Sequence, residues 1–337
     1  MYSRRFFLKS SALAMFGVGA APAWLSRAAY AADGPGRRKK VLVAIFQRGA
    51  ADGLNIVVPF GEKRYYEMRP TIAIPRPGGG PLSALDLTGF FGLHPALAPL
   101  KPIYDRRQLA IVEAVGSPDP TRSHFDAQDY MESGTPGMKA TPDGWLNRAL
   151  PVEAAGDSSP LRAVSLGPEL PRCLRGHNDA VAVSSLRSFH VADDSTASVF
   201  ENMYGASKDR VLNGTGRETF EAMKIVESIE KRPYVPEGGA VYPNGRMGQS
   251  LQQIAQLIKA DVGLEVAFTD IGGWDNHVGE VGALANALNQ FGASLAAFHQ
   301  DLGARMEDVT VATMSEFGRT ARENGNRGTD HGHANVM

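Results

Sequence analysis

The sequence predicts an α/β fold, a doubly wound and mostly parallel sheet with helices on both faces. Short apolar runs rich in strand-forming residues recur along the chain, and such runs are typical of parallel strands that are buried on both sides. Helical patterns lie between several of these runs, as in βαβ units. The chain has 337 residues, of which 43% are hydrophobic, so it is long enough to bury a large core.

The apolar runs give the strands and the one-sided apolar patterns give the helices. Strands are predicted at residues 41–46, 109–115, 163–166, 180–183, 264–271 and 309–314. A helix is predicted at 284–302, where apolar residues recur at alternating steps of four and three, and another at 250–260, where apolar residues lie on one side. The stretches 117–162 and 185–245 are rich in glycine, proline, serine and charge. We interpret them as long loops on the active side, or, at about 185–245, as an inserted cap.

The first residues have the pattern of a twin-arginine export signal. Arg4 and Arg5 precede an apolar run over residues 10–24 and a small-residue cleavage site. The apolar run is shorter than the roughly 20 residues that span hydrocarbon, so no stable membrane span is expected after processing. We therefore expect the twin-arginine translocase to be a partner, residues 1–31 to be removed, and one periplasmic domain to cover 32–337.

Charge and cysteine content narrow the class of protein. The formal net charge is -1, and the signal segment carries four basic residues and no acidic ones, so the mature chain reaches -5. This balance gives no indication of nucleic-acid binding. The single cysteine, Cys173, cannot form an intramolecular disulfide, which agrees with folding in the cytoplasm before export.

Candidate functional residues follow the first two predicted strands. Asp52 lies in a glycine-rich segment where it can point at a cation, although an ordinary Asp-Gly turn explains it equally well. Ser123 and Asp126 have the spacing of a capping box, which predicts the start of a helix. Thr121 or Ser123, next to Arg122 at the positive end of that helix, is therefore also a candidate nucleophile.

Acids and histidines also follow the last two predicted strands. They are Asp275, His277, Glu316, Asp330, His331 and His333. Carboxylate and imidazole groups are common metal ligands, and ligands bind beyond the carboxyl ends of the strands in sheets of this kind. The sequence therefore predicts a metal site at that edge.

Several of these segments resemble a known family, the twin-arginine-exported proteins of domain of unknown function 1501, in the alkaline phosphatase-like superfamily. The similar segments are 46–55, 91–95, 123–128, 273–277, 316–320 and 330–333. The resemblance implies an alkaline phosphatase-like fold and a hydrolase with two metal ions. It also implies that the chain lacks the last strands of the sheet, because family members continue further.

The resemblance also implies roles for single residues. Asp52 would be the metal ligand after the first strand, and Asp275 with His277 the middle pair of ligands. Glu316 stands where the superfamily usually has the aspartate of Asp-His-Gly, so Asp330 with His331 or His333 would supply the missing ligand. The nucleophile would be Ser123 or Thr121. The residues assigned to the substrate are Arg122, Arg319 and Asn55.

The expected function is hydrolysis of phosphate or related oxyanion esters by an exported, metal-dependent enzyme. Mixed aspartate, glutamate and histidine ligands favour zinc or manganese. The alternative is a periplasmic binding or assembly protein that keeps the fold without turnover, since fold does not imply function. A formylglycine sulfatase is excluded, because residues 171–175 do not match Cys-x-Pro-x-Arg.

Overall fold

The computed structural model describes residues 40–150, 159–190, 203–204, 210–231, 233–333 and 335–337. The predicted signal, residues 1–31, lies outside the described residues. A five-stranded sheet forms the centre, in the order β6-β5-β7-β1-β8. All four strand pairs are parallel. The strands are β1 (Val41–Gln47), β5 (Ala163–Leu166), β6 (Val181–Val183), β7 (Val266–Ile271) and β8 (Val309–Met314). The predicted α/β class with a mostly parallel sheet is confirmed.

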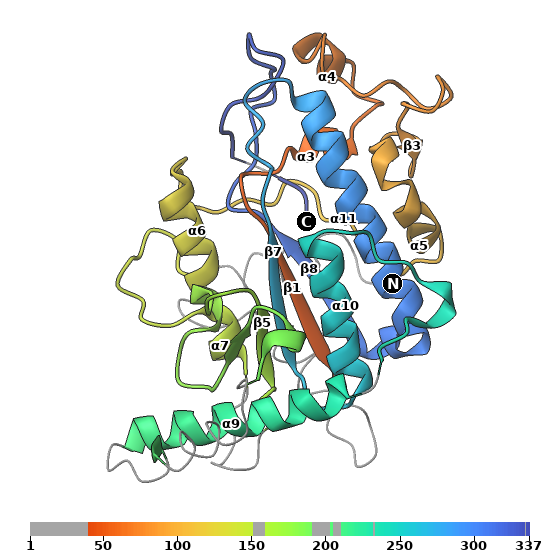
Figure 1. Ribbon diagram of the computed structural model, residues 1–337. Helices are drawn as coiled ribbons and strands as arrows, with labels where there is room; N and C mark the ends of the chain where they lie inside the picture. Colours follow the sequence, from red (N-terminus) through yellow and green to blue (C-terminus); the bar gives the residue numbers. More distant parts are fainter. Residues whose placement is uncertain (1–39, 151–158, 191–202, 205–209, 232, 334) are drawn as a thin grey trace, which may run out of the picture.

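Helices cover both faces of this sheet (Figure 1). The long helices α10 (Arg246–Lys259) and α11 (Glu280–Leu302) pack on one face, together with the 3₁₀ helix η1 (Pro95–Leu100). The short helices α6 (His124–Ser133) and α7 (Trp145–Ala149) lie on the other face. Both long helices begin four residues before their predicted starts, because Gly248 and Gly282 in their first turns have no side chain that could extend the apolar pattern.

Strand β1 shows why continuous apolar runs form the centre of the sheet. Val41, Val43 and Ile45 join the larger core with the long helices, whereas Ala44 and Phe46 join the smaller core on the opposite side. Alternate side chains of a strand point to opposite faces, so a strand that is buried on both faces must be apolar throughout.

The remaining elements surround this centre. A small antiparallel sheet has the order β2-β4-β3, and its strands are β2 (Val57–Val58), β3 (Leu85–Asp86) and β4 (Gly92–Leu93). The other α-helices among the described residues are α3 (Gly53–Ile56), α4 (Lys63–Met68), α5 (Lys101–Asp105) and α9 (Arg210–Glu230). Figure 1 shows α9 at the end of the sheet opposite to α3 and α4, so this part of 185–245 does not cover the carboxyl edge of the strands. Among the described residues, no helix is long and apolar enough to cross a membrane.

The predicted strand at 109–115 is wrong. Its backbone exchanges hydrogen bonds with the last residues at only two positions, Val112 with Met337 and Val115 with Asn335. Ala114 has φ 57°, a left-handed conformation that interrupts the extended backbone. An apolar run can indicate a strand by composition, yet a ladder needs uninterrupted extended residues beside a partner strand.

Candidate metal centre

The segments after β1, β7 and β8 meet at the carboxyl edge of the sheet. Phe46 is in register with Asp270 of β7 and with Met314 of β8, so the three segments leave the sheet side by side. Gly49 has φ 123°, and a Cβ built on it would lie 2.6 Å from the backbone nitrogen of Asp275. Only glycine allows the first two segments to approach this closely.

Four side chains from distant parts of the chain converge at this edge. The donor atoms of His124, Asp275 and His331 lie within 4.8 Å of one another. Nε2 of His331 is 3.0 Å from Nε2 of His124 and 3.4 Å from Oδ1 of Asp275. Nε2 of His277 is 2.9 Å from Nε2 of His331 and 3.0 Å from the same Asp275 oxygen. We call these four residues the histidine cluster.

The second nitrogen of each imidazole ring faces an acceptor. Nδ1 of His124 lies 2.8 Å from Glu316 Oε1, Nδ1 of His277 lies 3.2 Å from Asp330 Oδ1, and Nδ1 of His331 lies 2.9 Å from a backbone oxygen. Carboxylate and carbonyl oxygens only accept hydrogen bonds, so each Nδ1 carries a proton. In the neutral rings, all three Nε2 atoms therefore present lone pairs toward the centre of the cluster.

Glu316 orients His124 rather than joining the cluster. Its Oε1 also accepts hydrogen bonds from Gln128 Nε2 at 2.8 Å and from the backbone nitrogen of Gly49 at 2.9 Å. Burial raises the pKa of Glu316, but hydrogen bonds, first of all the one from Gln128, outweigh it and hold the pKa below its ordinary value. The group is therefore an ionised acceptor that fixes the ring of His124.

Arg319 holds the segments of the site together. Its guanidinium donates to the backbone oxygens of Gly49, Ala50, Trp274 and Thr329 and to the carboxylate of Asp275. Each of its nitrogens thus has a protein acceptor, which leaves none for the substrate role expected from the sequence. Partial burial raises the pKa of Asp275, yet the hydrogen bond and charge of Arg319 lower it overall. Burial, followed by the charge of His124, lowers the pKa of His331, which favours its neutral ring.

Asp52 lies apart from the histidine cluster, in a buried ion pair with Arg69. Both of its oxygens face that guanidinium, and the two side chains are 3% and 0% exposed. Burial raises the pKa of Asp52, but Arg69 lowers it overall. Asn55 is also buried, where it donates to Ile72 and Glu280. The structure therefore gives Asp52 and Asn55 contacts inside the protein, away from the histidine cluster.

Glu280 is the third ionisable group of this buried set. Burial, followed by the charge of Asp52, raises its pKa to about 9, against an ordinary value of 4.5. The folded chain therefore binds a proton between these pH values that the unfolded chain does not. We expect the free energy of unfolding to fall as pH rises through this window, by up to about 1.4 kcal/mol per pH unit from this group.

Urea unfolding of the parent and of Glu280→Gln at pH 6, 7, 8 and 9 would measure this slope. The variant has no proton to lose at this position, so its slope should be shallower. Equal slopes in the two proteins would contradict the protonated state of Glu280. The lowered pKa of Asp52 acts only at acidic pH, outside the range of this measurement.

The predicted nucleophiles lie at the start of α6. Ser123 is its N-cap and accepts the backbone N–H of Asp126 at 3.4 Å, as the capping box predicted. Thr121 Oγ1 accepts the backbone N–H of Ser123 at 3.3 Å. The backbone oxygen that faces His331 belongs to Arg122, whose own side chain is exposed. His333 is exposed and lies outside the histidine cluster.

The structure thus brings together Asp275, His277 and His331 of the predicted ligands, and places Glu316 and Asp330 behind the rings. Sequence reasoning missed His124 as a ligand candidate. The signal was its position directly after Ser123, since a residue at the start of a helix beside the sheet edge can face the strand ends.

Comparison with known proteins gives one match. The family described as "Protein of unknown function (DUF1501)" matches residues 109–337, which include every residue of the histidine cluster. No curated protein and no solved structure matches the chain.

Proposed function

Because the chain belongs to the DUF1501 family, whose description names no activity, we propose a function from the site itself: a metal-dependent hydrolase of phosphate or related oxyanion esters. The observation that carries the proposal is the convergence of imidazole nitrogens on Asp275 Oδ1. Lone pairs of neutral rings about 3 Å apart repel one another, and a bound cation turns that repulsion into attraction.

The donor set fits a zinc-type ion. His124, His331 and Asp275 supply two nitrogens and one oxygen, and His277 offers a further nitrogen next to them. Zinc accepts such mixed ligands at about 2.0–2.2 Å, and catalytic zinc sites keep one position open for water or substrate. The sequence led us to expect two ions. The residues that the structure describes offer one such group, so the proposal concerns one ion.

When bound, the cation would supply Lewis-acid polarisation of an ester oxygen and charge balance for the transferring group. The protein's own residues would position the reactants. Arg122 is exposed next to the cluster, and its side chain has no partner among the described residues, so it is free to bind an ester oxygen. Ser123 directly precedes His124, and its hydroxyl is the candidate nucleophile of this proposal.

Metal analysis of the full-length protein, together with phosphomonoester, phosphodiester and sulfate ester substrates, tests the proposal. We expect about one ion per chain and turnover of at least one ester that stops with chelator and returns with zinc or manganese. Bound metal without turnover of any ester would favour the alternative, an exported binding or assembly protein. Absence of bound metal after exposure to both ions would overturn both the metal site and the hydrolase.

Replacement of Ser123 by alanine distinguishes a role as nucleophile from a role as helix cap. If Ser123 attacks the ester, turnover should be abolished while metal content is unchanged and stability falls by only about 1 kcal/mol, the contribution of a lost cap. Thr121→Ala is the matched variant at the other predicted hydroxyl. Turnover at the parental rate in both variants would contradict a serine or threonine nucleophile and leave hydrolysis to water.

The proposal includes the alkaline phosphatase-like class and export to the periplasm through the twin-arginine translocase. The α/β fold and the adjacent arginines Arg4 and Arg5 support these two parts. Replacement of both arginines by lysine should leave the uncleaved precursor in the cytoplasm, as measured by cell fractionation and immunoblotting. Normal arrival of the double variant in the periplasm would contradict this route.

A further inference from the structure

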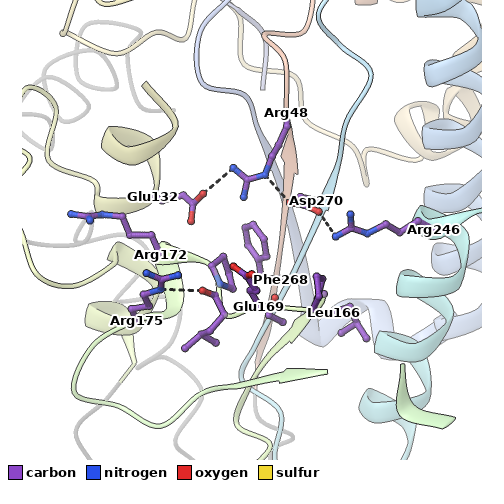
Figure 2. A pocket seen from close by; sticks show the side chains of 14 residues that line it. Arg48, Glu132, Leu166, Glu169, Arg172, Arg175, Arg246, Phe268 and Asp270 are labelled. Atoms are coloured by element: carbon purple, nitrogen blue, oxygen red, sulfur yellow. Dashed lines mark hydrogen bonds and ion pairs between the residues drawn. The ribbon is translucent and has the colours of Figure 1, made fainter. Parts of the chain in front are cut away.

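A polar cavity lies at the carboxyl ends of β5, β7 and β1, on the same edge of the sheet as the histidine cluster. It has a volume of about 400 Å³, within the range of about 300–1,000 Å³ that is typical of small-molecule sites. Figure 2 shows that arginine side chains from separate parts of the chain surround it. They are Arg48 after β1, Arg172 and Arg175 after β5, and Arg246 at the start of α10.

The acidic residues of this cavity are already engaged by protein donors. Asp270 accepts from Arg48 Nε at 2.7 Å and from Arg246 Nη2 at 2.6 Å. Glu132 pairs with Arg48 Nη1 at 2.9 Å and accepts the backbone N–H of Cys173 at 3.1 Å. The remaining acid, Glu169, is exposed.

The arginines, in contrast, have N–H donors that contact no acceptor among the described residues. Within the described residues, Arg175 donates only through Nε, to the backbone oxygen of Leu170 at 3.1 Å, and so both of its terminal nitrogens lack an acceptor. Arg246 uses Nη2 alone, and Arg48 uses Nε and Nη1. Nitrogens of three guanidinium groups that line the cavity are therefore available to one ligand.

We propose that this cavity binds the oxyanion group of a small organic molecule, a phosphate or a carboxylate, through Arg48, Arg175 and Arg246. A guanidinium matches both groups, because its planar pair of N–H donors can bind two oxygens at once. Pro168, Leu170 and Pro171 also line the cavity and are at least partly exposed, so apolar surface is present for the carbon part of the ligand.

The cavity is a different site from the histidine cluster, although hydrogen bonds connect the two. Arg48 Nη1 donates to Gln128 Oε1 at 3.0 Å, and Gln128 Nε2 donates to Glu316 Oε1, which faces His124. None of the three arginines contacts a member of the cluster in the described structure. Oxyanion binding here therefore needs no metal ion, and it stands or falls separately from the proposed hydrolase.

Isothermal titration calorimetry on the full chain after chelator treatment tests this site, because a metal ion at the histidine cluster would itself bind phosphate. The probes are inorganic phosphate, phenyl phosphate and benzoate, which distinguish the oxyanion and the contribution of the carbon part. We expect one saturable site for at least one probe on the metal-free protein, and weaker binding at higher salt. The double variant Arg175→Gln and Arg246→Gln should lose roughly tenfold or more in affinity.

Arg305→Gln is the matched control, because Arg305 does not line the cavity and, among the described residues, pairs with Asp261 in a partly exposed ion pair. It should bind every probe like the parent. Circular dichroism and the urea midpoint establish that the double variant is folded, since the side chains of Arg175 and Arg246 are largely exposed. The proposal is overturned if no probe binds the metal-free protein, or if the folded double variant binds like the parent.

Discussion

Replacement of His331 by alanine should remove the bound metal and, with it, hydrolysis. His331 is the centre of the histidine cluster, because its Nε2 lies within 3.4 Å of His124, His277 and Asp275. Loss of residues that only orient metal ligands costs about 10–100-fold in affinity, so loss of a ligand should cost more than about 100-fold. Metal analysis after gel filtration and the rate of ester hydrolysis measure the two effects.

His333→Ala is the matched control for this variant. His333 is exposed, lies two residues away and is outside the histidine cluster, so its replacement should leave metal content and turnover unchanged. Glu316→Gln should fall between the two, about 10–100-fold weaker in metal affinity, because it removes the charge behind His124 and keeps an acceptor oxygen. Full metal occupancy in His331→Ala would contradict the assignment of the site.

Replacement of Arg69 by methionine should cost about 3–5 kcal/mol of folding free energy. The variant leaves the carboxylate of Asp52 buried without its partner, beside the buried carboxyl of Glu280. Removal of one member of a buried ion pair is this costly because the remaining charge has lost both water and its counter-ion. Arg69 also donates to the backbone oxygens of Thr320 and Ala321, and these contacts are lost as well.

Urea unfolding followed by fluorescence measures this loss at neutral pH. Arg305→Met is the control, because the ion pair between Arg305 and Asp261 is partly exposed and should contribute at most about 1 kcal/mol. A loss in Arg69→Met no larger than in this control would show that the Asp52 carboxylate is not stabilised by the pair. The metal content of Arg69→Met should match the parent, because Arg69 contacts no member of the histidine cluster among the described residues.

The sheet was predictable because its strands are apolar on both faces. Residues 163–166 and 309–314 form strands with the predicted bounds, and the predicted strand at 41–46 ends one residue later. The run at 109–115 has a similar composition, but no local sequence pattern predicts the left-handed backbone of Ala114 or the lack of a neighbouring strand. Pairing partners are a property of the whole fold, which composition alone does not determine.

The site was predictable in position and less so in the roles of its residues. Asp275, His277 and His331 meet because parallel strands end at one edge, and that rule needs no knowledge of side-chain packing. Asp52 also follows a strand of this edge, but in the structure its carboxylate pairs with Arg69. Arg69 lies 17 residues later, and no sequence pattern links the two residues. His124 was not predicted, because the capping spacing indicates a role for the Ser123 hydroxyl and none for the imidazole ring of the next residue.

The hydrogen bonds from Arg319 to backbone carbonyl groups hold the loops of the site in place without a metal ion. This guanidinium ties Gly49, Trp274 and Thr329 together with protein groups alone. Loops that are already fixed lose little conformational entropy when a ligand binds, so the ion's interactions appear as affinity. Small zinc domains behave differently, since they unfold when a chelator removes the metal. For the metal ion that we propose, we therefore expect exchange while the ligand loops remain in place.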